Sequence, residues 1–316
     1  MHVTRRAFFS VGMGTVLSVS ACHREKVSRP LMVIVVPSLD NPFFRAEAST
    51  AVALAGSLGY RVRVDAHDDD AYRQDNLIDS AIASNAATII LDNAGADSSI
   101  AAVQRATRKS IPCFLMDREI AVEGIAKAQI IADNDQGARI VATEFARGLG
   151  PDGGEYAELL GRESDTNAQV RTRGFHAVLD EQKNLVRVAA QSANWSQSEA
   201  FQKAETILQA HRNLRGIIAG NDAMALGAMA AVKSAGQTGI VITGFDGSPE
   251  AIAAIRAGDL RATTLQPAVA IARLAVNEAD RFLKTGSTDK TERQLIPCDL
   301  VTRTNAGEYG EFEKVR

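Results

Sequence analysis

Short apolar runs alternate with longer segments in which apolar residues recur at helical spacing, from residue 31 almost to the end of the chain. The first run, L-M-V-I-V-V at 31–36, contains no polar residue and is rich in valine, as in a parallel strand that is covered on both faces. Asp40 or Asn41 can cap the next helix, and Pro42 suits its first position. The pattern predicts a strand, a short loop and a helix that continues over 46–58.

The same alternation follows in two series. The first series predicts strands at 60–66, 88–92, 112–117 and 129–132, and helices at 71–86, 98–109 and 136–149. The second predicts strands at 155–160, 186–191, 216–220 and 240–245, and helices at 167–182, 196–210, 223–235 and 248–257. Such alternation is typical of parallel sheets with helices on both faces. We therefore expect an α/β protein with two similar lobes, joined at the turn-rich stretch 148–154.

The first residues have the features of a targeting signal. T-R-R-A-F-F at 4–9 has the twin-arginine form, and the apolar run at 7–19 is too short to cross ~30 Å of hydrocarbon at ~1.5 Å per residue. V-S-A-C at 19–22 resembles a lipobox, which predicts cleavage before Cys22 and acylation of that cysteine. An ordinary signal peptide with an incidental cysteine is the alternative. Residues 1–22 are then the signal peptide and the polar residues 23–30 a tether, so we expect a soluble body held by lipid at a membrane outside the cytoplasm.

Composition narrows the possible functions. The formal net charge of −3 and the isoelectric point near 6.0 lack the basic character of nucleic-acid-binding proteins. Besides Cys22 the chain has Cys113 and Cys298, each expected in its own strand; a disulfide is possible outside the cytoplasm, but we favour two buried, unreactive thiols. The acidic run at 68–70 lacks the alternating spacing of a calcium loop, so we expect no metal and no cofactor.

Polar and aromatic side chains gather just after the predicted strands, at the edge of an α/β sheet where ligands usually bind. They are Asn41, Phe43, Phe44, Asp117, Arg118, Arg171, Trp195, Asn221, Phe245, Asp246 and Gln266. Carboxylates accept hydrogen bonds, a guanidinium donates in a fork, and amides do both, so the set suits a polyol whose C–H faces pack on aromatic rings. Each member also has a structural explanation, as a helix cap, a surface ion pair or a core residue.

Six motifs occur in an order that resembles one known family. They are D-N-P-F-F (40–44), I-P-C-F-L-M-D-R (111–118), R-T-R-G-F (171–175), G-N-D-A-M-A-L-G-A (220–228), G-F-D-G (244–247) and A-T-T-L-Q (262–266). With these motifs the chain resembles, over residues 31–302, the ribose-binding-protein family of periplasmic solute-binding proteins, the receptors of bacterial sugar ABC importers.

The resemblance implies two doubly wound parallel-sheet lobes joined by a three-crossing hinge, with breaks near Asp133, Gln266 and Pro297. The first lobe would comprise 31–133 and 267–296, and the second 134–266 and 297–316. It also implies specific roles in the site. Asn41, Asp117 and Arg118 would bind hydroxyls from the first lobe, and Arg171, Asn221, Asp246 and Gln266 would bind them from the second lobe and hinge. Phe43, Phe44 and Trp195 would stack on the sugar ring. Phe245 would shape the wall of the site.

Two departures from the family argue against ribose itself. Pro37 stands where ribose binders tend to have a hydroxyl side chain, and Trp195 is larger than the phenylalanine often found there. We expect a monomer that closes around a small monosaccharide, which is a pentose such as ribose, or a similar sugar or sugar alcohol, and delivers it to a membrane permease. A sugar-sensing transcription regulator would need a DNA-binding segment before residue 31. An enzyme is disfavoured because H-E-x-x-H and G-x-S-x-G are absent from the sequence.

Overall fold

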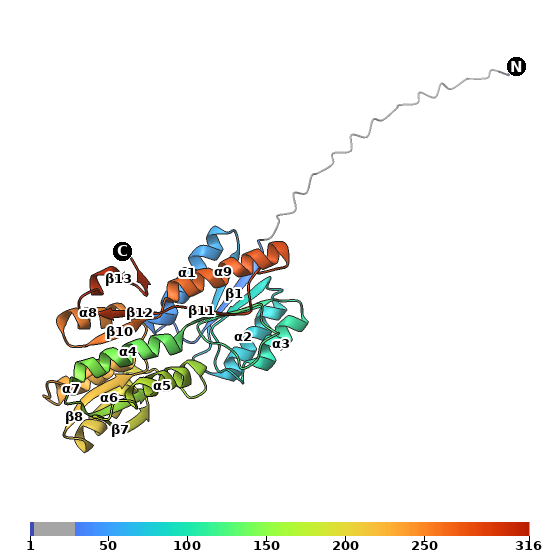
Figure 1. Cartoon of the computed structure of the whole chain (residues 1–316). Helices are drawn as coiled ribbons and strands as arrows, with labels where there is room; N and C mark the ends of the chain where they lie inside the picture. Colours follow the sequence, from blue (N-terminus) through green and yellow to red (C-terminus); the bar gives the residue numbers. More distant parts are fainter. Residues whose placement is uncertain (3–28, 316) are drawn as a thin grey trace.

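The computed structural model describes residues 1–2 and 29–315. Within 29–315 the chain forms two α/β lobes lying end to end (Figure 1). The predicted twin-arginine signal, the lipobox with Cys22 and most of the predicted tether lie outside the described residues. Within the described ranges, no helix combines the length and the apolar character needed to span a membrane.

The first lobe is built on a six-stranded parallel sheet. Its strands in spatial order are β11 (Arg293–Ile296), β5 (Ala128–Ala132), β4 (Cys113–Met116), β3 (Thr88–Leu91), β1 (Leu31–Val36) and β2 (Arg61–Ala66). One face is covered by α1 (Pro42–Ser57) and α9 (Ala268–Thr285), the other by α2 (Ala71–Ala83) and α3 (Ile100–Arg108). Alternate residues of β1 enter the two separate cores on these faces, which explains its uninterrupted apolar run.

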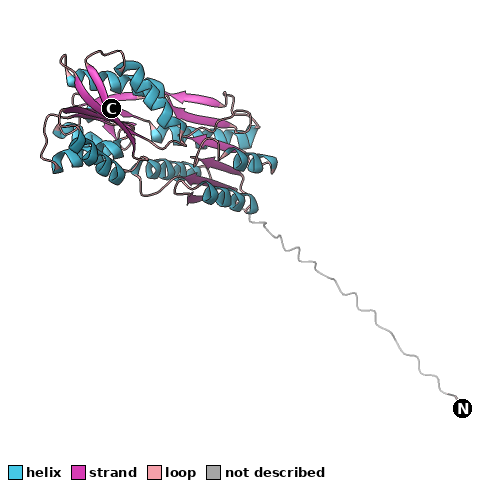
Figure 2. Ribbon diagram, turned by 90° about the horizontal axis from the view of Figure 1, so that it is seen from below, coloured by secondary structure: helices cyan, strands magenta, loops and turns pink. Residues whose placement is uncertain are grey.

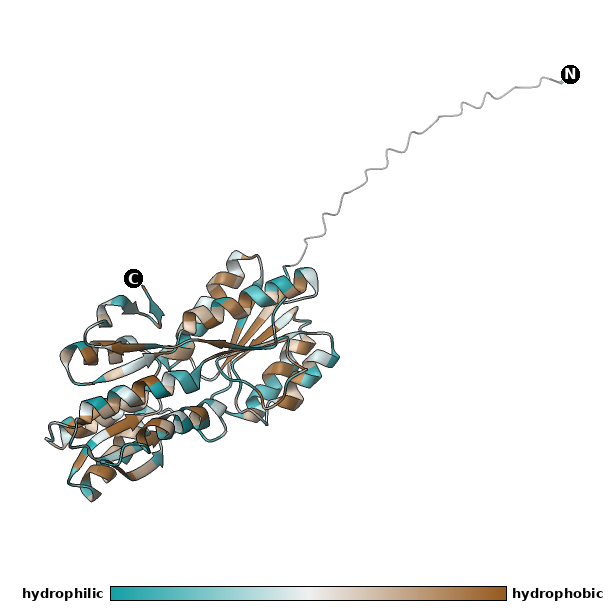
Figure 3. Ribbon diagram, viewed as in Figure 1, coloured by the Kyte–Doolittle hydropathy of each residue, from teal (hydrophilic) through white to brown (hydrophobic). Residues whose placement is uncertain are grey.

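The second lobe repeats this arrangement. Its strands in spatial order are β12 (Asp299–Thr302), β10 (Ala262–Leu265), β9 (Val241–Thr243), β8 (Leu214–Ala219), β6 (Gly154–Leu160) and β7 (Leu185–Ser192). Its helices are α4 (Asn134–Leu149) and α5 (Thr166–Leu179) on one face, and α6 (Gln197–Ala210), α7 (Asp222–Ser234) and α8 (Pro249–Ala257) on the other. Figure 2 shows the strands of each lobe between layers of helices, and Figure 3 shows that the strands are mostly hydrophobic and the outer helix surfaces more polar.

The chain crosses between the lobes three times: from β5 to α4, from β10 to α9, and from β11 to β12. The last crossing has only two residues, and β12 pairs antiparallel with β10. β11 leaves the first sheet at its carboxyl edge, and β12 enters the second sheet almost at once. β12 can run antiparallel to β10 only if it enters at the carboxyl edge of the second sheet. The carboxyl edges of the two sheets therefore face the same gap. The predicted fold class, two doubly wound lobes with a three-crossing hinge, is confirmed.

Two local features differ from the sequence-based expectations. Cys298 lies in the crossing between β11 and β12, not inside a strand, because the chain there must turn from one sheet into the other; Cys113 and Cys298 are both buried free thiols. The chain also ends in a small unpredicted unit, a 3-10 turn η1 (Ala306–Glu308) and a hairpin of β13 (Tyr309–Gly310) and β14 (Glu313–Lys314). These strands are too short to give a detectable apolar alternation.

Candidate functional site

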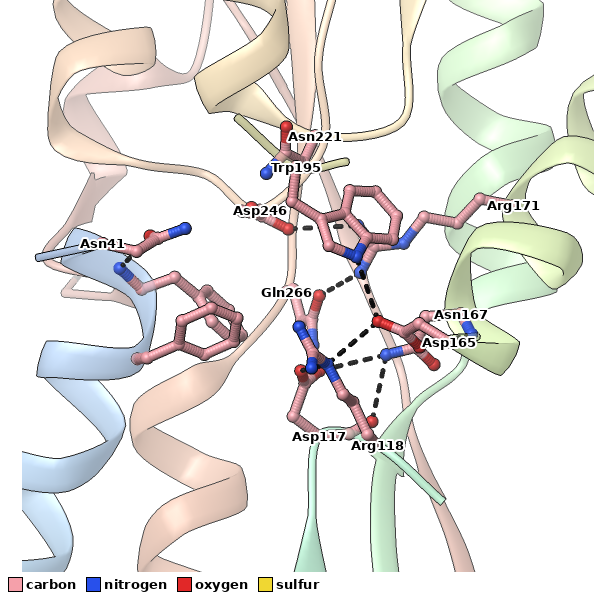
Figure 4. A pocket seen from close by; sticks show the side chains of 12 residues that line it. Asn41, Asp117, Arg118, Asp165, Asn167, Arg171, Trp195, Asn221, Asp246 and Gln266 are labelled. Carbon is pink, nitrogen blue, oxygen red and sulfur yellow. Dashed lines mark hydrogen bonds and ion pairs between the residues drawn. The ribbon is translucent and has the colours of Figure 1, made fainter. Parts of the chain in front are cut away.

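A cavity of about 290 Å³ lies between the lobes, at the facing carboxyl ends of the two sheets (Figure 4). Its lining residues are Asn41, Phe43, Phe44, Asp117, Arg118, Asp165, Asn167, Arg171, Trp195, Asn221, Asp246 and Gln266. The structure therefore brings together every residue predicted for the site except Phe245. A site with these polar and aromatic side chains, at the carboxyl ends of the strands, is suited to a small molecule.

The start of α1 forms one wall. The side chain of Asn41 caps the helix by accepting a hydrogen bond from the backbone N–H of Phe43 at 3.0 Å, and it also faces the cavity. The rings of Phe43 and Phe44 stand perpendicular with centroids 5.5 Å apart, and both are buried yet reach the cavity. Capping, core packing and lining the pocket are thus compatible roles for these residues.

Arg118 is the central cation on the first-lobe side. Its Nη1 donates to Asp69 Oδ1 at 2.7 Å and to the carbonyl oxygen of Asn93 at 3.0 Å, and its guanidinium lies 5.1 Å from the centroid of the Phe44 ring. Its Nε lies 2.9 Å from Asp165 Oδ2, which belongs to the second lobe. Asp117 and Arg118 are both buried, so they are not the surface ion pair that the sequence left as an alternative.

Asp117 follows β4 and has a left-handed backbone, with φ 60°. This conformation is uncommon outside glycine, and residues that adopt it cluster at functional sites. Its carboxylate accepts from the side-chain amides of Gln266 and Asn167. Burial, and then the charge of Asp165, raise the pKa of Asp117 to about 6. Burial likewise raises the pKa of Asp246 across the cavity. Both carboxylates are desolvated between the lobes, and this burial disfavours their charged forms.

Arg171, on α5, organises the second-lobe side. Its Nε donates to Asn134 Oδ1 at 2.8 Å, and its Nη1 donates to the carbonyl oxygen of Gly220 at 2.8 Å and to Asp246 Oδ1 at 3.2 Å. Its Nη2 donates to the side-chain oxygen of Gln266. The guanidinium is stacked on Phe245, which is fully buried behind it and does not line the cavity. The contribution of Phe245 to the wall is therefore made through Arg171.

The remaining second-lobe residues come from strand ends. Trp195 follows β7, and its Nε1 donates to Asp165 Oδ2 at 3.2 Å. Asn221 follows β8 and caps α7, accepting a hydrogen bond from the backbone N–H of Met224 at 2.9 Å. As with Asn41, the alternative of a helix cap is correct for Asn221 and does not remove it from the cavity.

Sequence reasoning missed Asp165 and Asn167. Asp165 caps α5, accepting a hydrogen bond from the backbone N–H of Asn167 at 2.9 Å, and the amide of Asn167 donates to the carbonyl oxygen of Asp117 at 3.1 Å. Both follow the end of β6, so the rule that located the other candidates also applied to them. From sequence alone, D-T-N at 165–167 also fits an ordinary helix start, because an aspartate there can cap a helix.

The cavity can bind a hydroxylated molecule, because aromatic rings line its walls and carboxylate, guanidinium and amide groups point into it. Among the described residues, no cluster of histidine, cysteine and acidic side chains is suited to a metal ion. Two α/β lobes with a polar and aromatic site between them define the type I periplasmic binding proteins.

Comparisons with known proteins agree with this class. Residues 32–288 match the periplasmic binding protein domain, so the chain belongs to this family. It is 52% identical over 282 residues to the D-apiose import binding protein of Paraburkholderia graminis, covering 89% of this chain and 90% of that protein. It is 33% identical over 293 residues to the ribose import binding protein of Haemophilus influenzae, covering 92% and 95%.

Among solved structures, a periplasmic solute-binding protein of an ABC transporter from Actinobacillus succinogenes, with bound D-allose, has a TM-score of 0.83 at 26% identity and covers 89% of this chain and 100% of its own. The predicted membership of the ribose-binding-protein-like family is confirmed. The relatives are import binding proteins, so the protein is a binding protein of the extracytoplasmic space and not an enzyme.

Proposed function

We propose that the protein is the receptor that captures D-apiose, or a pentose of similar size, for an ABC importer. The coarser assignment, a sugar-binding protein of such an importer, follows from its family and its relatives. D-Apiose is supported by the 52% identity to a D-apiose import binding protein. The bulk of Trp195, which lines the cavity, supports a pentose over larger sugars.

The observation that carries the proposal is the cavity itself, since it joins aromatic faces and charged hydrogen-bonding groups from both lobes. We propose that Asn41, Asp117 and Arg118 bind hydroxyls from one side, and Arg171, Asn221, Asp246 and Gln266 from the other. Phe43, Phe44 and Trp195 would pack on the ring. Hydrogen bonds to charged groups contribute about 1.5–3 kcal/mol each, and an unmatched buried partner costs a similar amount, which gives selectivity for each hydroxyl.

Binding and release would occur by closure and opening of the lobes. Direct contacts join the lobes beside the cavity: Arg118 with Asp165, Arg162 Nη2 with Asp69 Oδ2 at 3.3 Å, and the backbone N–H of Ala96 with the carbonyl oxygen of Ser164 at 3.1 Å. These contacts belong to a closed state and must break for a sugar to enter. A permease would then recognise the two lobe surfaces in their closed arrangement.

Calorimetry with the purified soluble domain tests the ligand. D-Apiose, D-ribose, D-allose and small alditols are titrated separately at pH 7.5. We expect D-apiose to bind at least tenfold more tightly than the others, a difference of about 1.4 kcal/mol. If another sugar binds and D-apiose does not, the assignment of D-apiose is wrong and the assignment as a sugar-binding protein still stands. If none of these compounds binds, the pentose proposal is contradicted.

We also propose the lobe boundaries 31–133 with 267–296 and 134–266 with 297–316. The position of α9 and β11 with the first sheet, and of β12 with the second, supports this division. Each lobe then contains two separate chain segments, as the three crossings require.

The export route and the anchor are a separate part of the proposal. The twin-arginine motif and the V-S-A-C sequence support export in the folded state followed by lipidation of Cys22. Replacing Cys22 with serine should move the protein from the membrane to the soluble fraction of the cell envelope. Unchanged membrane association of Cys22→Ser would reject the lipid anchor.

A further inference from the structure

The indole of Trp195 sits in a close-fitting slot on the second-lobe side of the cavity. The edge of its six-membered ring lies against Gly161, where a Cβ atom would overlap the ring. A Cβ on Gly220 would come within 3.1 Å of Cζ3 of the same ring. A side chain at position 161 would therefore overlap the indole, and one at position 220 would crowd it, so the ring lies directly against the backbone at Gly161.

The opposite end of the indole is held by a hydrogen bond. Nε1 donates to Asp165 Oδ2 at 3.2 Å, while the other oxygen of the same carboxylate caps α5. The carboxylate is therefore fixed by a helix and can in turn fix the indole. Asp165 is also the residue that meets Arg118 of the first lobe at 2.9 Å, so its carboxylate position depends on lobe closure (Figure 4).

The backbone of Trp195 adds a third observation. Its φ is 66° and that of Asn194 is 52°, two successive residues in the left-handed region. For a bulky side chain this conformation costs free energy and persists only where the surroundings enforce it. The amide of Asn194 donates to Glu199 Oε2 at 2.8 Å, which holds the turn from the side of α6. The ring is thus constrained from its backbone, its edge and its nitrogen.

We infer that Gly161 and Asp165 are positioning residues that fix the indole of Trp195 and so set the size of the sugar that the cavity accepts. The inference rests on the proposed function, because it assigns the limit on sugar size within the same site. Gly161 determines how far the indole can withdraw, and Asp165 determines its orientation. A residue that only stabilised the fold would leave the ratio between pentose and hexose affinities unchanged.

The chain contains a single tryptophan, so its fluorescence reports on this indole alone. Acrylamide quenching is measured without sugar in the wild type, in Asp165→Ser and in the control Asp70→Ser. Serine keeps the helix cap in both variants, and Asp70 caps α2 with an exposed side chain. We expect faster quenching in Asp165→Ser only, because the indole has lost its acceptor. Identical quenching in all three proteins would overturn the role of Asp165.

Sugar selectivity tests the second half of the inference. Calorimetry compares a bound pentose with a hexose in the wild type, Gly161→Ala and the control Gly56→Ala, whose added methyl group meets open space. We expect Gly161→Ala to push the indole into the cavity and to weaken pentose binding at least tenfold, with no effect of Gly56→Ala. Asp165→Ser should reduce the preference for the pentose. Unchanged affinities and ratios in both variants would overturn the inference.

A double-mutant cycle shows whether Asp165 acts through the indole. Trp195→Phe removes the N–H donor, so Asp165→Ser should cost less affinity in that background than in the wild type. Equal costs in the two backgrounds would contradict action through Trp195. If the wild type binds none of the sugars, the proposed function fails, while the quenching comparison still decides whether Asp165 holds the indole.

Discussion

The guanidinium carbon of Arg171 lies 3.8 Å from the centroid of the Phe245 ring. The aromatic face supports the flat side of the guanidinium and leaves its edge free for hydrogen bonds. Four N–H groups of Arg171 are matched to Asn134, Gly220, Asp246 and Gln266. Because a guanidinium has five N–H donors, one on Nη2 has no partner among the described residues. Phe245 thus orients a residue that lines the cavity without lining it itself.

Replacing Phe245 with leucine should therefore weaken sugar binding. A cation–π contact contributes about 0.5–2 kcal/mol, so we expect a loss of affinity of roughly 2- to 30-fold. Calorimetry gives the affinity and thermal unfolding gives the stability. Phe145→Leu is the control, since Phe145 packs on Tyr156 in the core of the same lobe. If both variants lose stability and neither loses affinity, Phe245 is only a core residue.

Arg171→Ala should abolish measurable sugar binding. It removes the remaining donor to the ligand and leaves the buried carboxylate of Asp246 without its cation, a change that costs about 3–5 kcal/mol of stability for a buried pair. Arg171→Lys should also bind at least tenfold more weakly, because an ammonium cannot reproduce the fork. Circular dichroism must show that both variants remain folded at 20 °C, and unchanged sugar affinity in both would reject Arg171 as a ligand contact.

Asp117→Asn should separate stability from binding. The pKa of Asp117 rises on folding from 3.8 to about 6, chiefly through burial. Between these pH values the folded state binds more protons than the unfolded state, so the contribution of this group to stability falls as the pH rises. We expect the ligand-free Asp117→Asn variant to unfold at a higher temperature than the wild type at pH 7.5, with the difference shrinking towards pH 4, and to bind sugar poorly. A lower unfolding temperature at pH 7.5 would contradict this.

Sugar affinity should fall as the pH is lowered through about 6. Protonation of Asp117 in that range removes a hydrogen-bond acceptor and its charge. Binding would then release protons near pH 6. Calorimetry in two buffers of different ionisation enthalpy measures this release directly. Equal binding enthalpies in both buffers would mean that no group titrates on binding.

The C-terminal hairpin should contribute to the site from a distance. The 3-10 turn η1 that precedes it is anchored on the second lobe, where Arg256 donates to the carbonyl oxygen of Ala306 at 2.6 Å. Phe312 of the hairpin nevertheless packs edge-on against Phe43 of the first lobe, with centroids 5.4 Å apart. Phe312→Ala removes this support, and we expect several-fold weaker sugar binding measured by calorimetry. Phe282→Ala, which disrupts the pair of Phe282 with Phe114, is the control and should affect stability alone.

Much of the site could be predicted because its residues follow strand ends. Asn41, Asp117, Asn221 and Asp246 each come directly after or within a few residues of a strand that an uninterrupted apolar run reveals. Parallel strands place these positions at one edge of a sheet, so their proximity follows from topology. Asp165 obeys the same rule, but a helix cap explains an aspartate at that place equally well from sequence alone.

The amino-acid sequence by itself determined the alternation of strands and helices, the two lobes and the polar residues at their facing edges, because a short apolar run and a helical repeat of apolar residues are both local patterns. Only the tertiary structure decided which atoms meet across the gap. Three sets of contacts depend on how distant segments pack. Phe245 lies behind Arg171, Asp165 contacts both Trp195 and Arg118, and Phe312 packs against Phe43. Side-chain contacts of this kind are fixed by the docking of whole lobes, and no local pattern encodes them.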